Sequence, residues 1–179
     1  MIKKLLLLAL LLSGSLQAQD RLSTSKGHIS FEASVAFFEA VTAENDNVLC
    51  TINVSRSQIY FTAFITDFQF ERSLMQEHFN ENYLESKRYP KAVFKGIIEN
   101  FDKNEIATTA KEYWIRGKIN IHGKTKKIRL PASIAKSSAG VYLKANFSLN
   151  TDDFNITIPF MVRSKISKKV NVAVVATLN

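Results

Sequence analysis

The most distinctive group of polar side chains lies between residues 78 and 85. It consists of His78, Glu81, Asn82, Tyr83 and Glu85. At the mouth of a cavity, an imidazole, carboxylates, an amide and a phenol could orient a ligand head group or gate access. On a short helix and its exit, the same groups also cap the backbone and hydrogen-bond neighbouring loops, which requires no ligand. Both interpretations, a ligand-orienting mouth and a structural cluster, stay open from sequence.

Metal coordination and catalysis have weaker support. Glu77, His78 and Glu81 have helical spacing, but a distant histidine, His28 or His122, would have to complete a metal site. We find no dense ligand motif, and we predict neither a metal ion nor another cofactor. The chain also lacks a nucleophile elbow, an HExxH motif and a phosphate-binding glycine loop. We therefore predict that this protein is not an enzyme.

The positive charge is distributed along the chain. The 24 Lys and Arg residues exceed the 16 Asp and Glu residues by 8, and the excess is 6 without Lys3 and Lys4. Such a balance favours an anionic membrane surface or an acidic partner and says little about fold. Basic β-barrels with surface aromatics can bind single-stranded nucleic acid. The scattered charges and the export signal described next argue against a nucleic-acid partner.

The N-terminus has the pattern of a secretory signal peptide. Lys3 and Lys4 precede an unbroken apolar run at 5–12, and small and polar residues follow it. This run is far shorter than the roughly 20 residues that cross a bilayer as a helix. We predict that residues 1–19 are a signal peptide, cleaved near Ala18, and that the protein is periplasmic or secreted.

The remaining residues, 20–179, are sufficient for one domain without disulfide bonds. Cys50 is the only cysteine, so no disulfide can form within the chain. It lies in an apolar alternation with Val48 and Ile52, which indicates a buried thiol. We therefore expect a single domain with an ordinary hydrophobic core.

Apolar and polar residues alternate through most of this domain, as they do in half-buried strands. Turns rich in Asn, Asp, Gly and Ser separate several of the runs, and short connections imply antiparallel neighbours. The eight runs are 29–35, 48–54, 59–65, 92–98, 115–121, 128–134, 141–149 and 170–174. Eight antiparallel strands can close into a barrel, which leaves no exposed sheet edge.

The alternation stops between residues 68 and 89. Leu74, Met75, His78 and Phe79 recur there at helical spacing instead. We expect a short helix in this segment. Because it interrupts the series of strands, it would cover one mouth of the barrel.

Several positions that should face the barrel interior carry small side chains. Examples are Ala63, Gly96, Gly117 and Ala145, which stand among larger Ile, Val and Phe residues. A barrel of eight strands either fills with side chains or holds one small ligand. Small inward residues leave room for a ligand, or they accommodate neighbouring Phe rings in a dry core. The pattern alone does not separate these two interiors.

Two segments resemble the signature of the YceI-like family. They are HFNENYLESKRYPKAVFKG at 78–96 and IRGKINIHGKTKKI at 115–128, and DFNI at 153–156 is similar to a third family motif. The resemblance covers most of residues 25–178. It implies a lipocalin-like barrel with an elongated apolar tunnel for an isoprenoid or another lipid chain.

The predicted fold is therefore all-β: an eight-stranded antiparallel lipocalin-like β-barrel with a short helix near one mouth. Tunnel walls must be apolar, because a buried polar atom without a hydrogen bond costs about 1–3 kcal/mol. We expect ligand-binding residues at inward positions of the wall and in the polar segment at the mouth. They are Phe31, Ile52, Phe61, Ala63, Phe94, Gly96, Gly117, Ile119, Leu143, Ala145 and Phe147, together with His78, Asn82 and Tyr83.

The predicted function is binding or carriage of a long apolar ligand in the periplasm. The alternative is a non-catalytic structural or stress-associated interaction module whose surface aromatics bind a partner. The 13 Phe and 5 Tyr residues exceed what one barrel interior readily absorbs. The helix, a membrane surface or a second copy in an isologous homodimer would cover the excess. A lipid is thus the expected ligand, with membrane docking and a homodimer as further expectations.

Overall fold

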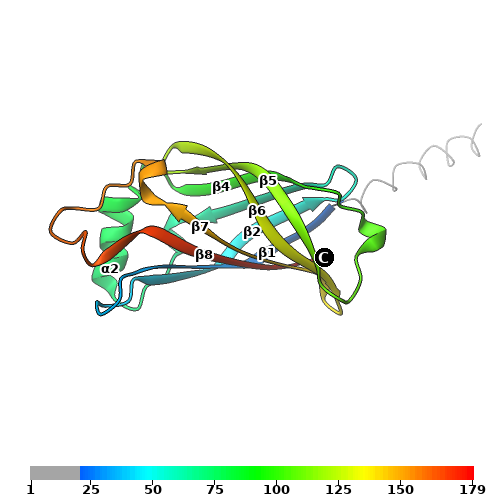
Figure 1. Ribbon diagram of the computed structural model, residues 1–179, viewed down its shortest axis with the longest axis horizontal. Coiled ribbons are helices and arrows are strands. Elements are labelled where there is room, and N and C mark those ends of the chain that lie inside the picture. The colour runs from blue at the N-terminus through cyan, green and yellow to red at the C-terminus, as the bar shows by residue number, and fades with distance from the viewer. Residues whose placement is uncertain (1–20) are drawn as a thin grey trace, which may run out of the picture.

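The computed structural model describes residues 21–179, and the predicted signal peptide at 1–19 lies outside them. Eight strands follow one another around a closed antiparallel barrel in chain order, and β8 returns to pair with β1. They are β1 (Arg21–Ser34), β2 (Thr42–Asn53), β3 (Gln58–Phe64), β4 (Lys91–Ile98), β5 (Lys111–Ile121), β6 (Lys124–Ser137), β7 (Gly140–Asn150) and β8 (Ile166–Leu178). Figure 1 shows the barrel from the side. The predicted all-β architecture is confirmed.

The alternation in the sequence becomes the alternation of side chains across the sheet. In β2, Val48, Cys50 and Ile52 are buried inside the barrel, whereas the intervening Leu49 is exposed. Burial raises the pKa of the Cys50 thiol through desolvation, so the thiol stays protonated. β1 begins earlier than the apolar run predicted, because its polar first residues pair with the end of β2, with Leu22 opposite Ile52.

A two-residue turn joins β5 to β6. His122 and Gly123 both have left-handed backbone conformations, with φ of 50° and 72°, which is the geometry of a tight hairpin turn. Gly123 also lies against the ring of Tyr89. A Cβ atom added at Gly123 would come within 2.7 Å of that ring. This turn places the His122 side chain beside the segment that follows the helix.

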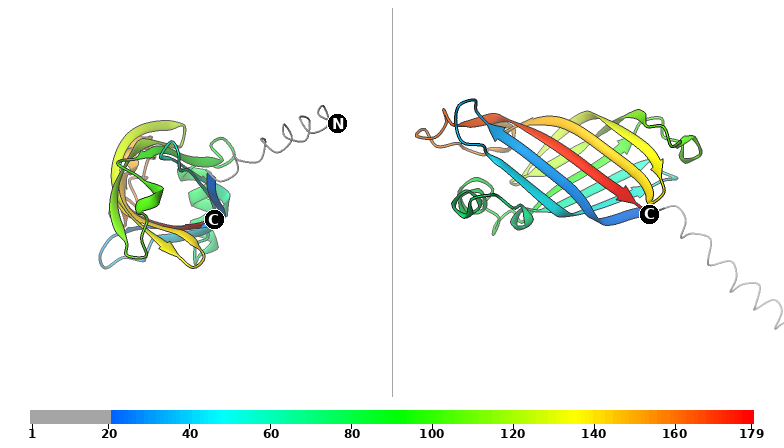
Figure 2. Two further views of the ribbon diagram at one scale, coloured as in Figure 1. Left: turned by 90° about the vertical axis from the view of Figure 1, so that its right-hand side faces the viewer. Right: turned by 90° about the horizontal axis from the view of Figure 1, so that it is seen from below.

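One end of the barrel carries the helical cap. Helix α2 (Ser73–His78) continues directly into η4 (Phe79–Tyr83), a single π-helical turn. Figures 1 and 2 show α2, the β1–β2 loop (35–41) and the β7–β8 loop (155–165) at this end, which we call the mouth. The C-terminus lies at the opposite end, where Ser23 and Asn179 exchange backbone hydrogen bonds. The predicted helix is confirmed at one mouth.

Three short 3-10 turns complete the described chain: η3 (Ile65–Asp67), η5 (Lys103–Glu105) and η6 (Thr151–Phe154). In η6 the Asn150 side chain accepts a hydrogen bond from the Asp152 amide, and Asn155 ends the turn in a left-handed conformation. Within residues 21–179, no helix has the length and apolar character needed to cross a bilayer.

Candidate ligand-binding cavity

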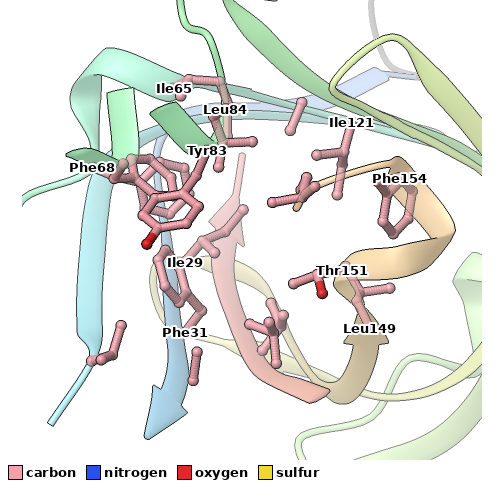
Figure 3. A pocket seen from close by; sticks show the side chains of 18 of the residues that line it. Ile29, Phe31, Ile65, Phe68, Tyr83, Leu84, Ile121, Leu149, Thr151 and Phe154 are labelled. Atoms are coloured by element: carbon pink, nitrogen blue, oxygen red, sulfur yellow. The ribbon is translucent and has the colours of Figure 1, made fainter. Parts of the chain in front are cut away.

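The barrel encloses an apolar cavity of about 450 Å³ in the half next to α2. Inward-facing residues of seven strands line it, together with residues of α2, η4, η6 and the β7–β8 loop. In Figure 3, Phe31, Phe68 and Tyr83 lie on one side of the cavity, and Thr151 and Phe154 lie across from them. Pockets for small molecules typically have volumes of about 300–1,000 Å³ and mainly apolar walls. The cavity therefore has the size and lining of a ligand site.

The other half of the barrel is filled by side chains. Ile52, Ile59, Ile98 and Leu178 are almost completely buried there, and none of them lines the cavity. The floor between the two halves includes Ile115, Leu130 and Leu143, which line the cavity and also belong to the buried core. The interior is thus a cavity with a packed floor rather than the tunnel that the family resemblance implies.

Four phenylalanine rings join the helical cap to the barrel. Phe79 of η4 lies 5.6 Å from Phe31 of β1, 5.7 Å from Phe68 and 5.0 Å from Phe70, measured between ring centroids. Such aromatic pairs stabilise by roughly 0.5–1.5 kcal/mol beyond the area they bury. The cap is consequently held as part of the cavity wall, and these rings account for much of the aromatic excess in the sequence.

Ten of the fourteen predicted ligand-binding residues line the cavity. They are Phe31, Phe61, Ala63, Phe94, Ile119, Leu143, Ala145, Phe147, His78 and Tyr83. The other four do not. Ile52 is in the filled half of the barrel, and Asn82 is exposed on the outside of η4. The remaining two, Gly96 and Gly117, lie beneath an aromatic ring.

Gly96 and Gly117 are direct partners across β4 and β5. A Cβ atom on either glycine would come within 2.7 Å of the Phe94 ring. At Gly117, the added atom would also lie 2.5 Å from the Lys95 carbonyl oxygen. The glycines therefore do not leave empty space for a ligand, because the ring of Phe94 occupies it. The Phe94 ring, and not the glycine pair, faces the cavity.

The polar segment at 78–85 divides into two parts. His78 and Tyr83 line the cavity at its mouth. Partial burial raises the pKa of the Tyr83 phenol by desolvation, so it remains a neutral donor. Glu85 instead turns to His122, and Glu81 approaches Lys87 at 3.9 Å. The segment therefore faces the cavity at His78 and Tyr83, whereas Glu85 contacts His122 and Glu81 lies at the surface.

His122 connects three segments around the mouth. Its Nδ1 lies 3.0 Å from the Phe154 carbonyl oxygen, and its Nε2 lies 3.0 Å from Oε1 of Glu85. Both partners are hydrogen-bond acceptors for a ring N–H of His122. The Tyr89 ring stacks edge-on against it, with 4.7 Å between centroids. His122 thereby sets the position of η6 relative to the cap.

Replacing His122 by Ala should lower the free energy of unfolding by about 2 kcal/mol, because its partly buried polar contacts with the Phe154 carbonyl and with Glu85 and its packing against Tyr89 are lost together. Urea denaturation of the purified protein measures this change. His28→Ala is the matched control, since His28 makes one hydrogen bond, to Asp46, at the exposed surface. His28→Ala should lower the free energy of unfolding by less than about 1 kcal/mol. Equal losses in the two variants would contradict this role for His122.

Sequence reasoning missed the wall that follows β7. Thr151, Phe154, Ile156 and Ile158 all line the cavity. Phe154 is buried to 1% exposure, and Thr151 Oγ1 is buried without a hydrogen-bond partner. The available signal was the period-two spacing of Phe154, Ile156 and Ile158, which continues the strand pattern into a segment that forms no strand. Within residues 21–179, no three side chains of His, Cys, Asp or Glu gather in a way that could hold a metal ion.

The chain matches a family model described as the YceI-like domain over residues 21–178. No curated protein matches it in sequence. A solved structure of a polyisoprenoid-binding domain from Saccharophagus degradans, implicated in plant cell wall breakdown, is similar with a TM-score of 0.79 at 12% identity. This match covers 89% of the present chain and 98% of that domain.

Two further structures share the barrel. BcnA of Burkholderia cenocepacia has a TM-score of 0.67 at 17% identity, over 85% of the present chain and 97% of that protein. A YceI protein of Campylobacter jejuni has a TM-score of 0.53 at 18% identity, over 86% and 85% of the respective chains. At these identities the structural likeness establishes the fold.

Proposed function

The chain belongs to the YceI-like family, and from this premise we propose that it binds and carries a long apolar molecule, an isoprenoid or another lipid, in the cavity. The observation that carries the proposal is the apolar cavity of about 450 Å³ beneath the helical cap. The similar domain from Saccharophagus degradans, a polyisoprenoid-binding domain, supports the choice of ligand class. A binding function, without catalysis, is the expectation that follows.

The walls can hold such a ligand without a specific polar contact. Each buried methylene contributes about 0.8 kcal/mol, so a chain of about ten carbons gains roughly 8 kcal/mol before the entropic cost of binding. Phe61, Phe147 and Val172 line the cavity from three different strands, and branching methyl groups of an isoprenoid would pack against their side chains. If burial of methylenes supplies the binding free energy, affinity increases with the length of the ligand's hydrocarbon chain.

Thr151 is a candidate partner for a polar end group of the ligand. Thr151 lines the cavity, and its Oγ1 is buried without a hydrogen-bond partner in the described chain. A buried hydroxyl without a partner is unfavourable, and a hydroxyl or carbonyl on the ligand would satisfy it. Thr151 lies near the mouth, immediately after β7. We therefore place the polar end of the ligand toward the mouth and its tail toward the packed floor.

The direct test is native mass spectrometry of the protein isolated from the periplasm, followed by organic extraction and identification of any bound molecule. We expect one lipid per protein, and delipidated protein should take up one molecule of geranylgeraniol. The intact mass should lack residues 1–19, as the proposed periplasmic location requires. A ligand-free mass that no added lipid changes would overturn the proposal and favour the interaction module.

Thr151→Val should have opposite effects on stability and on binding. Removing the unpartnered hydroxyl should raise the free energy of unfolding of the empty protein by about 1 kcal/mol. It should also weaken binding of geranylgeraniol about fivefold, because the alcohol loses its partner. Binding of the matching hydrocarbon, which has no hydroxyl, should not change. Titration of both probes checks this, and equal weakening of both would contradict the assignment of Thr151.

A further inference from the structure

Two neighbouring loops at the mouth expose large apolar side chains. Phe37 and Phe38 lie in the β1–β2 loop, and Phe160 and Met161 lie in the β7–β8 loop with 75% and 87% of their surfaces exposed. The loops leave adjacent strands, because Ser34 at the end of β1 pairs with Ile166 at the start of β8. Figure 2 shows both loops projecting beyond the strands at the mouth. Large apolar side chains exposed on neighbouring loops in this way indicate an interaction site.

The same loops form the rim of the cavity. Glu39 and Val41 of the first loop line it, as do Val162 and Lys165 of the second. Phe37 is fully exposed in a left-handed conformation with φ of 70°, which is rare for a bulky residue. Nothing within the described chain covers its ring. Whatever surface covers these side chains therefore also lies over the entrance of the cavity.

Charge on the loops indicates which surface this is. Residues 154–169 contain four basic residues and no acidic residue. Arg163 and Lys165 form no ion pair within residues 21–179, and the Arg163 guanidinium lies 3.9 Å from the centre of the Phe160 ring. Glu39, the carboxylate of the other loop, is paired with Arg72. Cations held beside exposed apolar tips match a lipid surface, where anionic phosphates border the acyl chains.

We propose that the β1–β2 and β7–β8 loops dock the mouth onto an anionic bilayer, with Phe37, Phe160 and Met161 inserted and Arg163 and Lys165 at the phosphates. Docking in this orientation opens the cavity toward the membrane, so an apolar ligand need not cross water. The exposed apolar side chains and the basic residues of the two loops support the docking proposal without reference to the proposed function. Only the passage of a ligand through the docking surface rests on the proposed function.

Vesicle co-sedimentation of the processed protein tests the docking. Vesicles of phosphatidylethanolamine and phosphatidylglycerol should bind at least tenfold more tightly than vesicles of phosphatidylcholine, and added salt should weaken the binding. Phe160→Ser with Met161→Ser should reduce binding at least tenfold, as should Arg163→Gln with Lys165→Gln. The matched control is Leu49→Ser with Ile97→Ser, which removes exposed apolar side chains from the strands of the barrel. The control should bind vesicles like the wild type.

Wild-type protein that ignores both kinds of vesicle, or loop variants that bind as tightly as the wild type, would overturn the docking surface. Self-association of the wild type that the loop variants abolish, without vesicle binding, would assign the loops to a second copy of the chain and would also overturn it. Geranylgeraniol presented in detergent should bind to the variant with Phe160→Ser and Met161→Ser as to the wild type, because neither residue lines the cavity. Vesicle binding by a protein that takes up no lipid would leave the docking intact and remove the proposed function.

Discussion

Ala145→Phe is expected to abolish binding of geranylgeraniol, with a loss of affinity of a hundredfold or more, while the barrel stays folded. Ala145 is buried on β7 and lines the cavity between Leu143 and Phe147. A benzyl side chain at this position would extend into the cavity, where it displaces the ligand. Overpacking in a filled core typically costs about 1–3 kcal/mol, and the cavity should keep the cost near the lower limit.

Ala173→Phe is the matched control for this experiment. Ala173 lies on β8, next to Val174, which is the cross-strand partner of Ala145. Val172 and Val174 line the cavity, so Ala173 between them points to the other face of the sheet. The control should bind geranylgeraniol like the wild type. If folded Ala145→Phe protein binds the probe with unchanged affinity, the ligand does not occupy this cavity.

Gly117→Ala is expected to lower the free energy of unfolding by about 3 kcal/mol, at the upper end of the range for overpacking. Its new Cβ atom would meet the Lys95 carbonyl oxygen at 2.5 Å and the Gly96 Cα atom at 2.7 Å. Both are backbone atoms of the paired strand, so only a shift of the sheet relieves the contact. The loss should be visible in urea denaturation and should not depend on ligand.

Gly96→Ala provides the comparison, because its two closest contacts, both at 2.7 Å, are with the ring of Phe94. In a Phe94→Leu background this clash should be relieved, and Gly96→Ala should cost markedly less than in the wild type. Gly117→Ala should cost nearly as much in either background, since the backbone contacts remain. A double-mutant cycle measures both couplings. Identical couplings for the two glycines would contradict this account of the pair.

The packed core and the proposed binding site occupy different parts of this barrel. The half near the C-terminus is filled by Ile52, Ile59 and Leu178, which supply ordinary core packing. The half near α2 carries the cavity, and the aromatic contacts of Phe79 together with the hydrogen bonds of His122 hold its rim. A packed floor compensates for the apolar surface that the cavity leaves uncovered. This division lets one end of a small barrel stay open to a ligand.

The sequence by itself determined the elements. Period-two alternation predicted eight strands, and helical spacing at Leu74, His78 and Phe79 predicted the cap, because side-chain direction follows directly from backbone periodicity. The number of antiparallel strands and the avoidance of exposed edges then favoured a closed barrel. Most of the part of the wall that the strands supply, including Phe31, Phe61 and Ala145, followed from parity alone.

Only the tertiary structure decided which inward positions enclose space. The alternation places Ile52 and Ala63 on the same inner face of the barrel. Their positions along the barrel axis differ, so Ile52 lies in the packed half whereas Ala63 lines the cavity. Gly96 and Gly117 seemed to leave room until a ring from the neighbouring position, Phe94, was found to occupy it. The contributions of Thr151 and His122 depend on contacts between segments distant in the chain. The periodicity of a strand determines which way each side chain points. Whether empty volume remains inside the barrel depends on the side chains that all the other strands place at the same level along the barrel axis.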